Sequence, residues 1–205
     1  PPLPGIDLPE LHVLRNIDDM DAIKAGLDGK LALAERGDRG PVRCVVIGAG
    51  YIGLEMAENL KHRGATVDVV EMSDQILPPI DHEMSVPVEH HLRSRGISLH
   101  LSTAAAAFTR RDGGELTNST FLDADVVILS VGVRPNVDLA RAAGLTLGER
   151  GGLSVDTHMR TSDPHIWAAG DSVETPNTVL GGSWIAPLAG PANRQGRIAA
   201  DVIAG

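Results

Sequence analysis

The chain has few aromatic residues, a single cysteine and no long hydrophobic run. Aromatic residues make up 2% of its 205 residues, so a hydrophobic core must be largely aliphatic. Cys44 is the only cysteine and cannot form an internal disulfide, which favours a reducing compartment and leads us to expect a cytoplasmic protein. The longest apolar run, residues 124–133, is interrupted by polar residues, so no membrane association is expected. The formal net charge of −9, without a Lys/Arg cluster, argues against a nucleic-acid partner.

A strand–turn–helix–strand pattern runs from Val42 to Glu71. A short apolar run is followed at once by the glycine motif Gly48-Ala-Gly50-Tyr-Ile-Gly53, and a helical pattern and a second β-rich run come next. Gly48 permits a tight turn, Gly50 lets the backbone approach a pyrophosphate, and Gly53 lets the helix pack closely on the strand. The free N–H groups and the positive dipole end at the helix start would then hold the phosphate charge.

The acid at the end of the second strand indicates which coenzyme is bound. Glu71 lies 18 residues after Gly53, where a carboxylate can accept hydrogen bonds from the ribose hydroxyls of an adenosine. The same carboxylate would repel a 2′-phosphate, so the pattern predicts NAD(H) rather than NADP(H). The alternative is a glycine-rich turn that has only a packing role.

The remaining patterns predict an α/β protein: a Rossmann-like parallel sheet with helices on both faces and an inserted antiparallel β-meander. Residues 1–16 are expected to be an extended connecting segment. Helices are expected over 18–35, around Met84 to Leu92, from an Asn136 cap to 143, and from Pro191 onward. Strands are expected at 97–101, 105–111, 115–121, 125–131 and within 151–161, with a hairpin turn at 112–114 and a loop at 177–183.

Four stretches together carry a family resemblance: residues 48–55, 131–136, 161–171 and 187–196. With them the chain resembles the FAD-dependent pyridine nucleotide-disulfide oxidoreductases, in the branch of coenzyme A-disulfide reductase, NADH oxidase and NADH peroxidase. The resemblance implies that hydride passes from NADH to FAD and then on to a small-molecule acceptor, which is a disulfide, persulfide, peroxide or oxygen. It also implies that the full-length parent is a homodimer.

The resemblance also implies a domain map. Residues 1–36 would be a linker and helix leading into the NAD domain, 37–150 the NAD(H)-binding domain, and 151–205 the C-terminal part of an incomplete FAD-binding domain. The family's first FAD motif, its redox cysteine and its dimerisation domain have no match here, and the chain begins Pro-Pro-Leu-Pro rather than with Met. We therefore expect the central fragment of a longer enzyme, inactive by itself.

Several coenzyme roles follow from the resemblance. Tyr51 matches an aromatic residue that covers the flavin until nicotinamide displaces it, and Ile52 belongs to the same motif. Glu55 matches an acid near the nicotinamide carboxamide, and Gly132 would allow the nicotinamide half to pass closely. On the residues alone, Tyr51 could be a tyrosine at a strand–helix junction, and Glu55 could be a first-turn acid favoured by the helix dipole.

Three more residues match the flavin side of the family. Asp171 ends the second FAD motif and would accept a hydrogen bond from the ribityl chain. Leu188 and Ala189 lie at the start of the last helix, whose N–H groups would point at the flavin ring. The alternatives are a carboxylate that caps its own Gly-Asp turn and an ordinary surface helix.

No catalytic residue and no metal site is predicted. Cys44 lies inside the first buried strand, where a small apolar role is expected. His90 and His91 point about 100° apart on a helix, so with His82 they are read as solvated or helix-terminal residues. Two other functions stay open: a stand-alone NAD-dependent dehydrogenase without flavin, and a non-catalytic NAD-binding module.

Overall fold

The structure is a computed structural model that describes residues 3–109, 113–116, 121–179 and 181–205. The chain forms two compact units, Pro1–Gly132 and Val133–Gly205. Each unit is described by itself.

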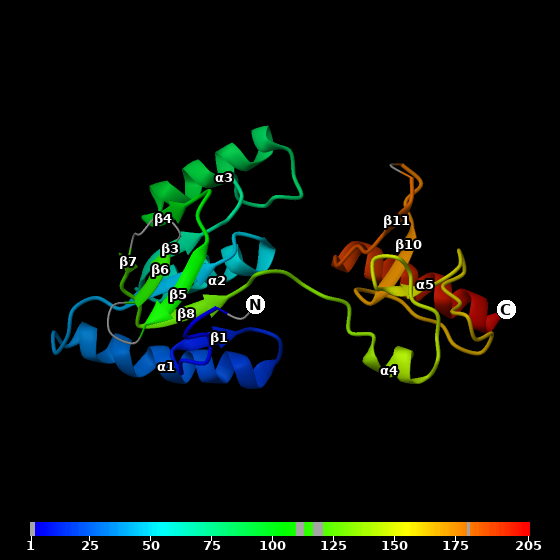
Figure 1. Ribbon diagram of the computed structural model, residues 1–205, viewed down its shortest axis with the longest axis horizontal. Coiled ribbons are helices and arrows are strands. Elements are labelled where there is room, and N and C mark those ends of the chain that lie inside the picture. The colour runs from blue at the N-terminus through cyan, green and yellow to red at the C-terminus, as the bar shows by residue number, and fades with distance from the viewer. Residues whose placement is uncertain (1–2, 110–112, 117–120, 180) are drawn as a thin grey trace. The chain divides into compact units, whose positions relative to one another are not determined.

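The first unit is built on a five-stranded parallel sheet (Figure 1). Its order is β1 (Leu11–Val13), β8 (Val126–Leu129), β2 (Arg43–Ile47), β3 (Thr66–Val70) and β4 (Ile97–His100). All four neighbouring pairs are parallel. The apolar runs of β2 and β8 form central strands because both faces of each are covered, whereas Ser98 of the edge strand β4 is exposed.

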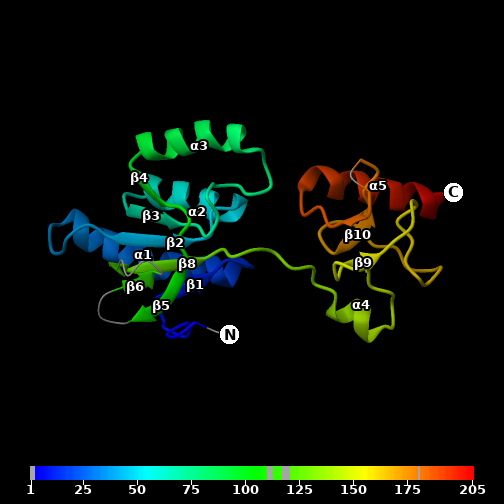
Figure 2. The ribbon, with the colours of Figure 1, turned by 45° about the horizontal axis from the view of Figure 1, so that its top comes forward.

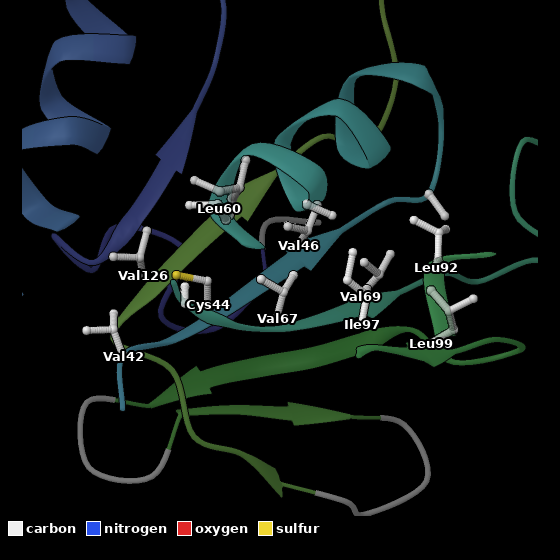
Figure 3. Packing of buried hydrophobic residues seen from close by; sticks show 14 of the residues in the cluster. Val42, Cys44, Val46, Leu60, Val67, Val69, Leu92, Ile97, Leu99 and Val126 are labelled. Carbon is white, nitrogen blue, oxygen red and sulfur yellow. The ribbon is translucent and has the colours of Figure 1, made fainter. Parts of the chain in front are cut away.

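Three helices cover one face of this sheet: α1 (Ile17–Glu35), α2 (Tyr51–His62) and α3 (His82–Ser94). Alternate strand residues such as Cys44, Val46 and Val67 point to this face, and Leu60 of α2 and Leu92 of α3 pack in the same cluster (Figure 3). Glycines with positive φ follow the ends of α2 and α3: Gly64 has φ of 94° and Gly96 has φ of 73°.

The opposite face is covered by an antiparallel meander, β5 (Ala105–Thr109), β6 (Gly113–Leu116) and β7 (Phe121–Leu122). Phe108 of β5 packs there on Val45 and Val127, together with apolar residues of the N-terminal segment. The Rossmann-like parallel sheet with an inserted meander is therefore confirmed. The expectation of helices on both faces is wrong in this unit, because the meander and the N-terminal segment occupy the second face.

Two local predictions in this unit are also corrected. Residues 1–16 are more than a connection, since β1 adds an edge strand beside β8. A strand of three residues among prolines is too short to show a period. The strand predicted at 115–121 is divided between β6 and β7, which pair with each other. Gly113 and Gly114 of the predicted turn belong to β6, whereas residues 110–112 and 117–120 lie outside the described residues.

The second unit contains α4 (Asp138–Ala142), β9 (Leu153–Ser154), β10 (Val173–Pro176), β11 (Ser183–Trp184) and α5 (Ala189–Ala204) (Figure 2). Its three-stranded sheet has the order β11-β10-β9, and its core contains Val155, Met159, Val173 and Ala199. The compact units divide at Gly132, whereas the expected domain map divides at 150; that map concerns a longer protein and stays a prediction.

Helix starts in the second unit differ from the predictions. Val137, not Asn136, is the N-cap of α4, and no side chain caps this helix. Pro191 is the third residue of α5 rather than the first, because the helix begins at Ala189. The predicted loop at 177–183 connects β10 to β11, a hairpin that the sequence pattern did not reveal.

Candidate dinucleotide-binding site

The glycine turn joins the end of β2 to the start of α2, and its packing requires glycine at two places. Gly48 has φ of 101°, and a Cβ there would lie 2.5 Å from the Ser130 carbonyl oxygen. A Cβ on Gly53 would lie 1.9 Å from the Gly48 carbonyl oxygen and 2.7 Å from Ser130 Oγ. Both glycines are therefore needed to bring the turn, α2 and the end of β8 together.

Gly50 is different, because no atom lies within 4 Å of the position that its Cβ would take. It is the N-cap of α2 with φ of −76°, a conformation that other residues adopt. No side chain caps the helix, and its first turn holds no acid. The positive end of the helix dipole therefore lies beside open space that a pyrophosphate could enter.

Glu71 directly follows β3 and is bound to the glycine turn. Its carboxylate accepts hydrogen bonds from the backbone N–H of Ala49 at 2.7 Å and of Ser73 at 2.8 Å. The side chain is half-buried, and an ionised carboxylate can accept about four hydrogen bonds. Acceptor capacity therefore remains for the ribose of a bound coenzyme.

Two further residues that the sequence did not single out complete this region. Ser130 Oγ lies 2.9 Å from the Ile47 carbonyl oxygen and 3.0 Å from that of Gly48, so it ties β8 to the turn. Leu77 donates its backbone N–H to the Ala49 carbonyl at 2.9 Å. The only sequence signal for Ser130 was a polar residue at the end of an apolar strand.

The other predicted coenzyme residues of this unit lie around the start of α2 and after β8. Tyr51 is the first residue of α2 and is 52% exposed; Ile52 is 41% exposed, and Glu55 is exposed one turn later. Gly132 has φ of 112°, with nothing within 4 Å of its Cβ position. The side chains of Tyr51, Ile52 and Glu55 and the backbone at Gly132 are accessible to a ligand, and their contacts with coenzyme stay predictions.

The structure also brings the predicted flavin residues of the second unit together. Asp171 is exposed in a turn after Gly170, whose N–H donates to Gln195 Oε1 of α5 at 2.8 Å. Leu188 is the N-cap of α5, Ala189 is its first residue, and no side chain caps that helix. The Asp171 turn is thereby held against the first half of α5.

Glu174 is a buried acid of β10 that sequence reasoning missed, and it organises the second unit. Its carboxylate accepts hydrogen bonds from Ser183 Oγ and from the N–H groups of Arg150 and Gly152. Although burial raises the pKa of this carboxyl, the Ser183 hydroxyl and the backbone N–H groups lower it below its ordinary value. Gly148 leaves room for the carboxylate, because its Cβ would lie 2.4 Å from Glu174 Cδ.

Cys44 has the properties of a core residue. It is fully buried, and burial, with a smaller contribution from the Asp125 carboxylate, raises the pKa of its thiol to about 12. In the part of the chain that the structure describes, no group of three His, Cys, Asp or Glu residues is placed to hold a metal ion. Nor is any helix among the described residues both long and apolar enough to cross a bilayer.

Comparisons with known proteins agree with this geometry. The family model for pyridine nucleotide-disulphide oxidoreductases matches residues 1–186. The NADH oxidase of Methanocaldococcus jannaschii is 37% identical over 208 residues, which cover 100% of this chain and 44% of that protein.

Two solved structures are similar as well. The NAD-dependent persulfide reductase from A. fulgidus is 39% identical with a TM-score of 0.88, covering 100% of this chain and 37% of that one. An FAD-dependent pyridine nucleotide-disulphide oxidoreductase from Desulfovibrio vulgaris is 36% identical with a TM-score of 0.79. The match covers 100% of this chain and 51% of that one. The chain thus spans about half or less of the length of these relatives. The family expected from the four sequence motifs is confirmed: the chain belongs to the pyridine nucleotide-disulphide oxidoreductases.

Proposed function

We propose that the first unit binds NAD(H), as the coenzyme-binding portion of a flavoprotein oxidoreductase. The pyrophosphate is held by N–H groups at the start of α2, where Gly50 allows close approach. Glu71 accepts hydrogen bonds from the adenosine ribose. The observation that carries this proposal is the hydrogen bond between Glu71 and Ala49, since it joins the ribose-binding acid to the phosphate-binding turn.

Coenzyme choice follows from the charge of Glu71. A 2′-phosphate would bring a second anion against a carboxylate that is already fixed by two backbone N–H groups and cannot move away without losing them. NADH is therefore preferred to NADPH. The name of the similar persulfide reductase, NAD-dependent, supports the same choice.

The second unit contributes residues to the FAD-binding site of the same enzyme. Asp171 and the uncapped start of α5, at Leu188 and Ala189, have the chemistry to hold FAD, a carboxylate for a hydroxyl and N–H groups for a ring carbonyl. Bound there, FAD would supply the redox chemistry, as acceptor of the hydride from NADH and donor of electrons to a disulfide, persulfide, peroxide or oxygen. Tyr51, Ile52, Glu55 and Gly132 position the nicotinamide half. The longer protein acts in the cytoplasm as a homodimer.

Calorimetric titration of the 205-residue chain with NADH, NADPH and ADP-ribose tests the coenzyme proposal. NADH should bind about tenfold more tightly than NADPH, or more. A tenfold ratio of dissociation constants corresponds to a difference of about 1.4 kcal/mol in binding free energy. ADP-ribose should bind almost as well as NADH, because the adenosine and pyrophosphate contacts come from this chain. Equal or tighter binding of NADPH would overturn the assignment of Glu71.

A further inference from the structure

The backbone of Ala49, in the middle of the glycine turn, is held from two sides. Its N–H donates to Glu71 Oε2 at 2.7 Å, and its carbonyl accepts from the N–H of Leu77 at 2.9 Å. Ala49 itself is fully buried. Glu71 already belongs to the proposed coenzyme site, so the hydrogen bond whose role is still open is the one from Leu77.

The hydrogen bond from Leu77 determines which way the next peptide group faces. In a trans peptide the carbonyl of one residue and the N–H of the next point in opposite directions, and the described residues contain no cis peptide bond. Because Leu77 donates to the Ala49 carbonyl, the N–H of Gly50 points the other way. That N–H donates to no acceptor among the described residues, and nothing lies within 4 Å of the Cβ position of Gly50. A flipped peptide would present a carbonyl oxygen there, which repels a phosphate.

Leu77 makes this hydrogen bond from an unusual backbone conformation. Its φ is 48°, in the left-handed region that residues with a side chain rarely adopt, and it precedes Pro78, where extended backbone is ordinarily preferred. Its side chain is buried, and its carbonyl accepts from the N–H of Ile80 at 3.0 Å. Strained conformations of this kind persist where the surrounding structure determines them, and they are concentrated at binding sites.

We propose that Leu77 is a positioning residue of the coenzyme site. Its N–H fixes the Ala49–Gly50 peptide in the orientation that turns the Gly50 N–H toward the pyrophosphate, before any ligand is bound. Glu71 and Leu77 thus hold the same turn for two different parts of the coenzyme, the ribose and the phosphates. The proposal rests on the proposed NAD(H) function, and it gives Leu77 a backbone role rather than an apolar contact with the ligand.

Leu77→Ile tests the backbone conformation at nearly constant side-chain volume, because a β-branched residue at positive φ is strongly disfavoured. We expect Leu77→Ile to bind ADP-ribose roughly tenfold more weakly than the wild type, the scale of losing a hydrogen bond to a charged group. Adenosine has the ribose but no phosphate, so it should bind the two proteins equally. A general loss of structure would weaken the binding of both ligands. Titrations followed by NMR measure both affinities.

Two matched controls separate this role from side-chain packing. Leu77→Met keeps the volume without branching at Cβ, and Leu99→Ile makes the same substitution at an equally buried leucine of β4, where a β-branched residue is favoured. Both variants should bind ADP-ribose as the wild type does. Unchanged ADP-ribose affinity in Leu77→Ile, an equal loss for adenosine, or an equal loss in Leu77→Met would overturn the role of Leu77 and leave the NAD(H) function standing. A wild type that does not bind ADP-ribose would overturn both.

Amide hydrogen exchange in the wild type tests the same proposal without a variant, and it decides the matter if Leu77→Ile does not fold. The Leu77 amide should be protected in the free protein, because it is hydrogen-bonded to Ala49. The Gly50 amide should exchange quickly in the free protein and slowly once ADP-ribose is bound. A rapidly exchanging Leu77 amide, or a Gly50 amide whose exchange ADP-ribose does not slow, would refute the positioning role.

Discussion

The Glu71 carboxylate lies 2.7 Å from the backbone nitrogen of Ala49, so the acid at the end of β3 is bound to the glycine turn at the end of β2. Removing this carboxylate should therefore affect both the turn and the coenzyme. We expect Glu71→Ala to weaken NADH binding by about 1–3 kcal/mol, the cost of losing charge-assisted hydrogen bonds to a buried or half-buried partner. Calorimetry measures this loss, and thermal unfolding should show a lower Tm because the N–H groups of Ala49 and Ser73 lose their acceptor.

The control for this prediction is Asp74→Ala. Asp74 is an exposed acid three residues further along the same loop, and its removal changes the net charge equally. NADH affinity should be the same in Asp74→Ala as in the wild type. If both variants lose affinity equally, the effect is one of general charge and Glu71 has no specific role.

The glycine turn makes a paired prediction, because two of its glycines differ in their surroundings. Gly53→Ala should lower the free energy of unfolding strongly, since its Cβ would lie 1.9 Å from the Gly48 carbonyl oxygen. Gly50→Ala should fold with an unchanged Tm, because its Cβ would meet nothing within 4 Å. Yet Gly50→Ala should lose NADH affinity if a pyrophosphate approaches there. Normal NADH binding by a stable Gly50→Ala variant would contradict that placement.

Much of the first unit could be predicted from the sequence because its signals are local. The strand, the glycine turn, the helix and Glu71 follow one another within residues 42–71. The residue pattern of each of these parts is typical of a single kind of secondary structure. The pairing of β5 with β6 was likewise predicted from two short β-rich runs beside a Gly pair, although the turn between them lies outside the described residues. What could not be predicted is which face each element covers, since periodicity shows that a strand is buried on both sides but does not identify its neighbours.

One physical reason explains why two functional residues were not predicted from the sequence. Ser130 and Glu174 each act on backbone groups far away in the chain: Ser130 on Ile47 and Gly48, and Glu174 on Arg150 and Gly152. A single polar residue in an apolar strand is compatible with many partners, and only the fold selects one. The same holds for β10 and β11, two short strands without a clear hydrophobic pattern, which the hydrogen bond between Glu174 and Ser183 also joins.

Tyr51 should act as a gate in the longer flavoprotein rather than as a packing residue. Because it is 52% exposed, Tyr51→Ala should leave the Tm of the chain unchanged. In the longer protein, the same substitution should alter the rate at which NADH reduces the flavin, followed by stopped-flow absorbance. Tyr51→Phe is the control, since it keeps the ring and should keep the rate. An unchanged rate of flavin reduction in Tyr51→Ala would mean that Tyr51 has no gating role.

Glu174 should make the stability of the second unit depend on pH. Its pKa is lowered in the folded state from an ordinary value of 4.5, so the ionised form is favoured by folding. This contribution is complete above the ordinary value and is lost as the pH falls below it and through the folded pKa. Glu174→Gln should remove that part of the acid dependence, measured by urea unfolding at several pH values.

Asp156 of the same unit also has a lowered pKa, chiefly because the Arg160 N–H donates to it. The wild type and the Glu174→Gln variant both keep Asp156, so the difference between their two pH profiles reports Glu174 alone. Glu174→Gln should also be less stable at neutral pH, because a neutral amide oxygen accepts weaker hydrogen bonds from the N–H groups of Arg150 and Gly152 than a carboxylate does. Two parallel pH profiles would refute the role of Glu174 ionisation.

The 205-residue chain should bind NADH without consuming it. The first unit holds the glycine turn, Glu71 and the five-stranded sheet, which together form the proposed coenzyme site. For flavin, the described residues offer Asp171 and the start of α5, and half of a binding site loses many contacts while the entropy cost of binding remains. The purified chain should therefore be colourless, and its absorbance at 340 nm should stay constant when NADH is mixed with oxygen or disulfides. Steady loss of NADH in a flavin-free sample would favour a stand-alone dehydrogenase, because a hydride acceptor other than flavin would then have to bind to this chain.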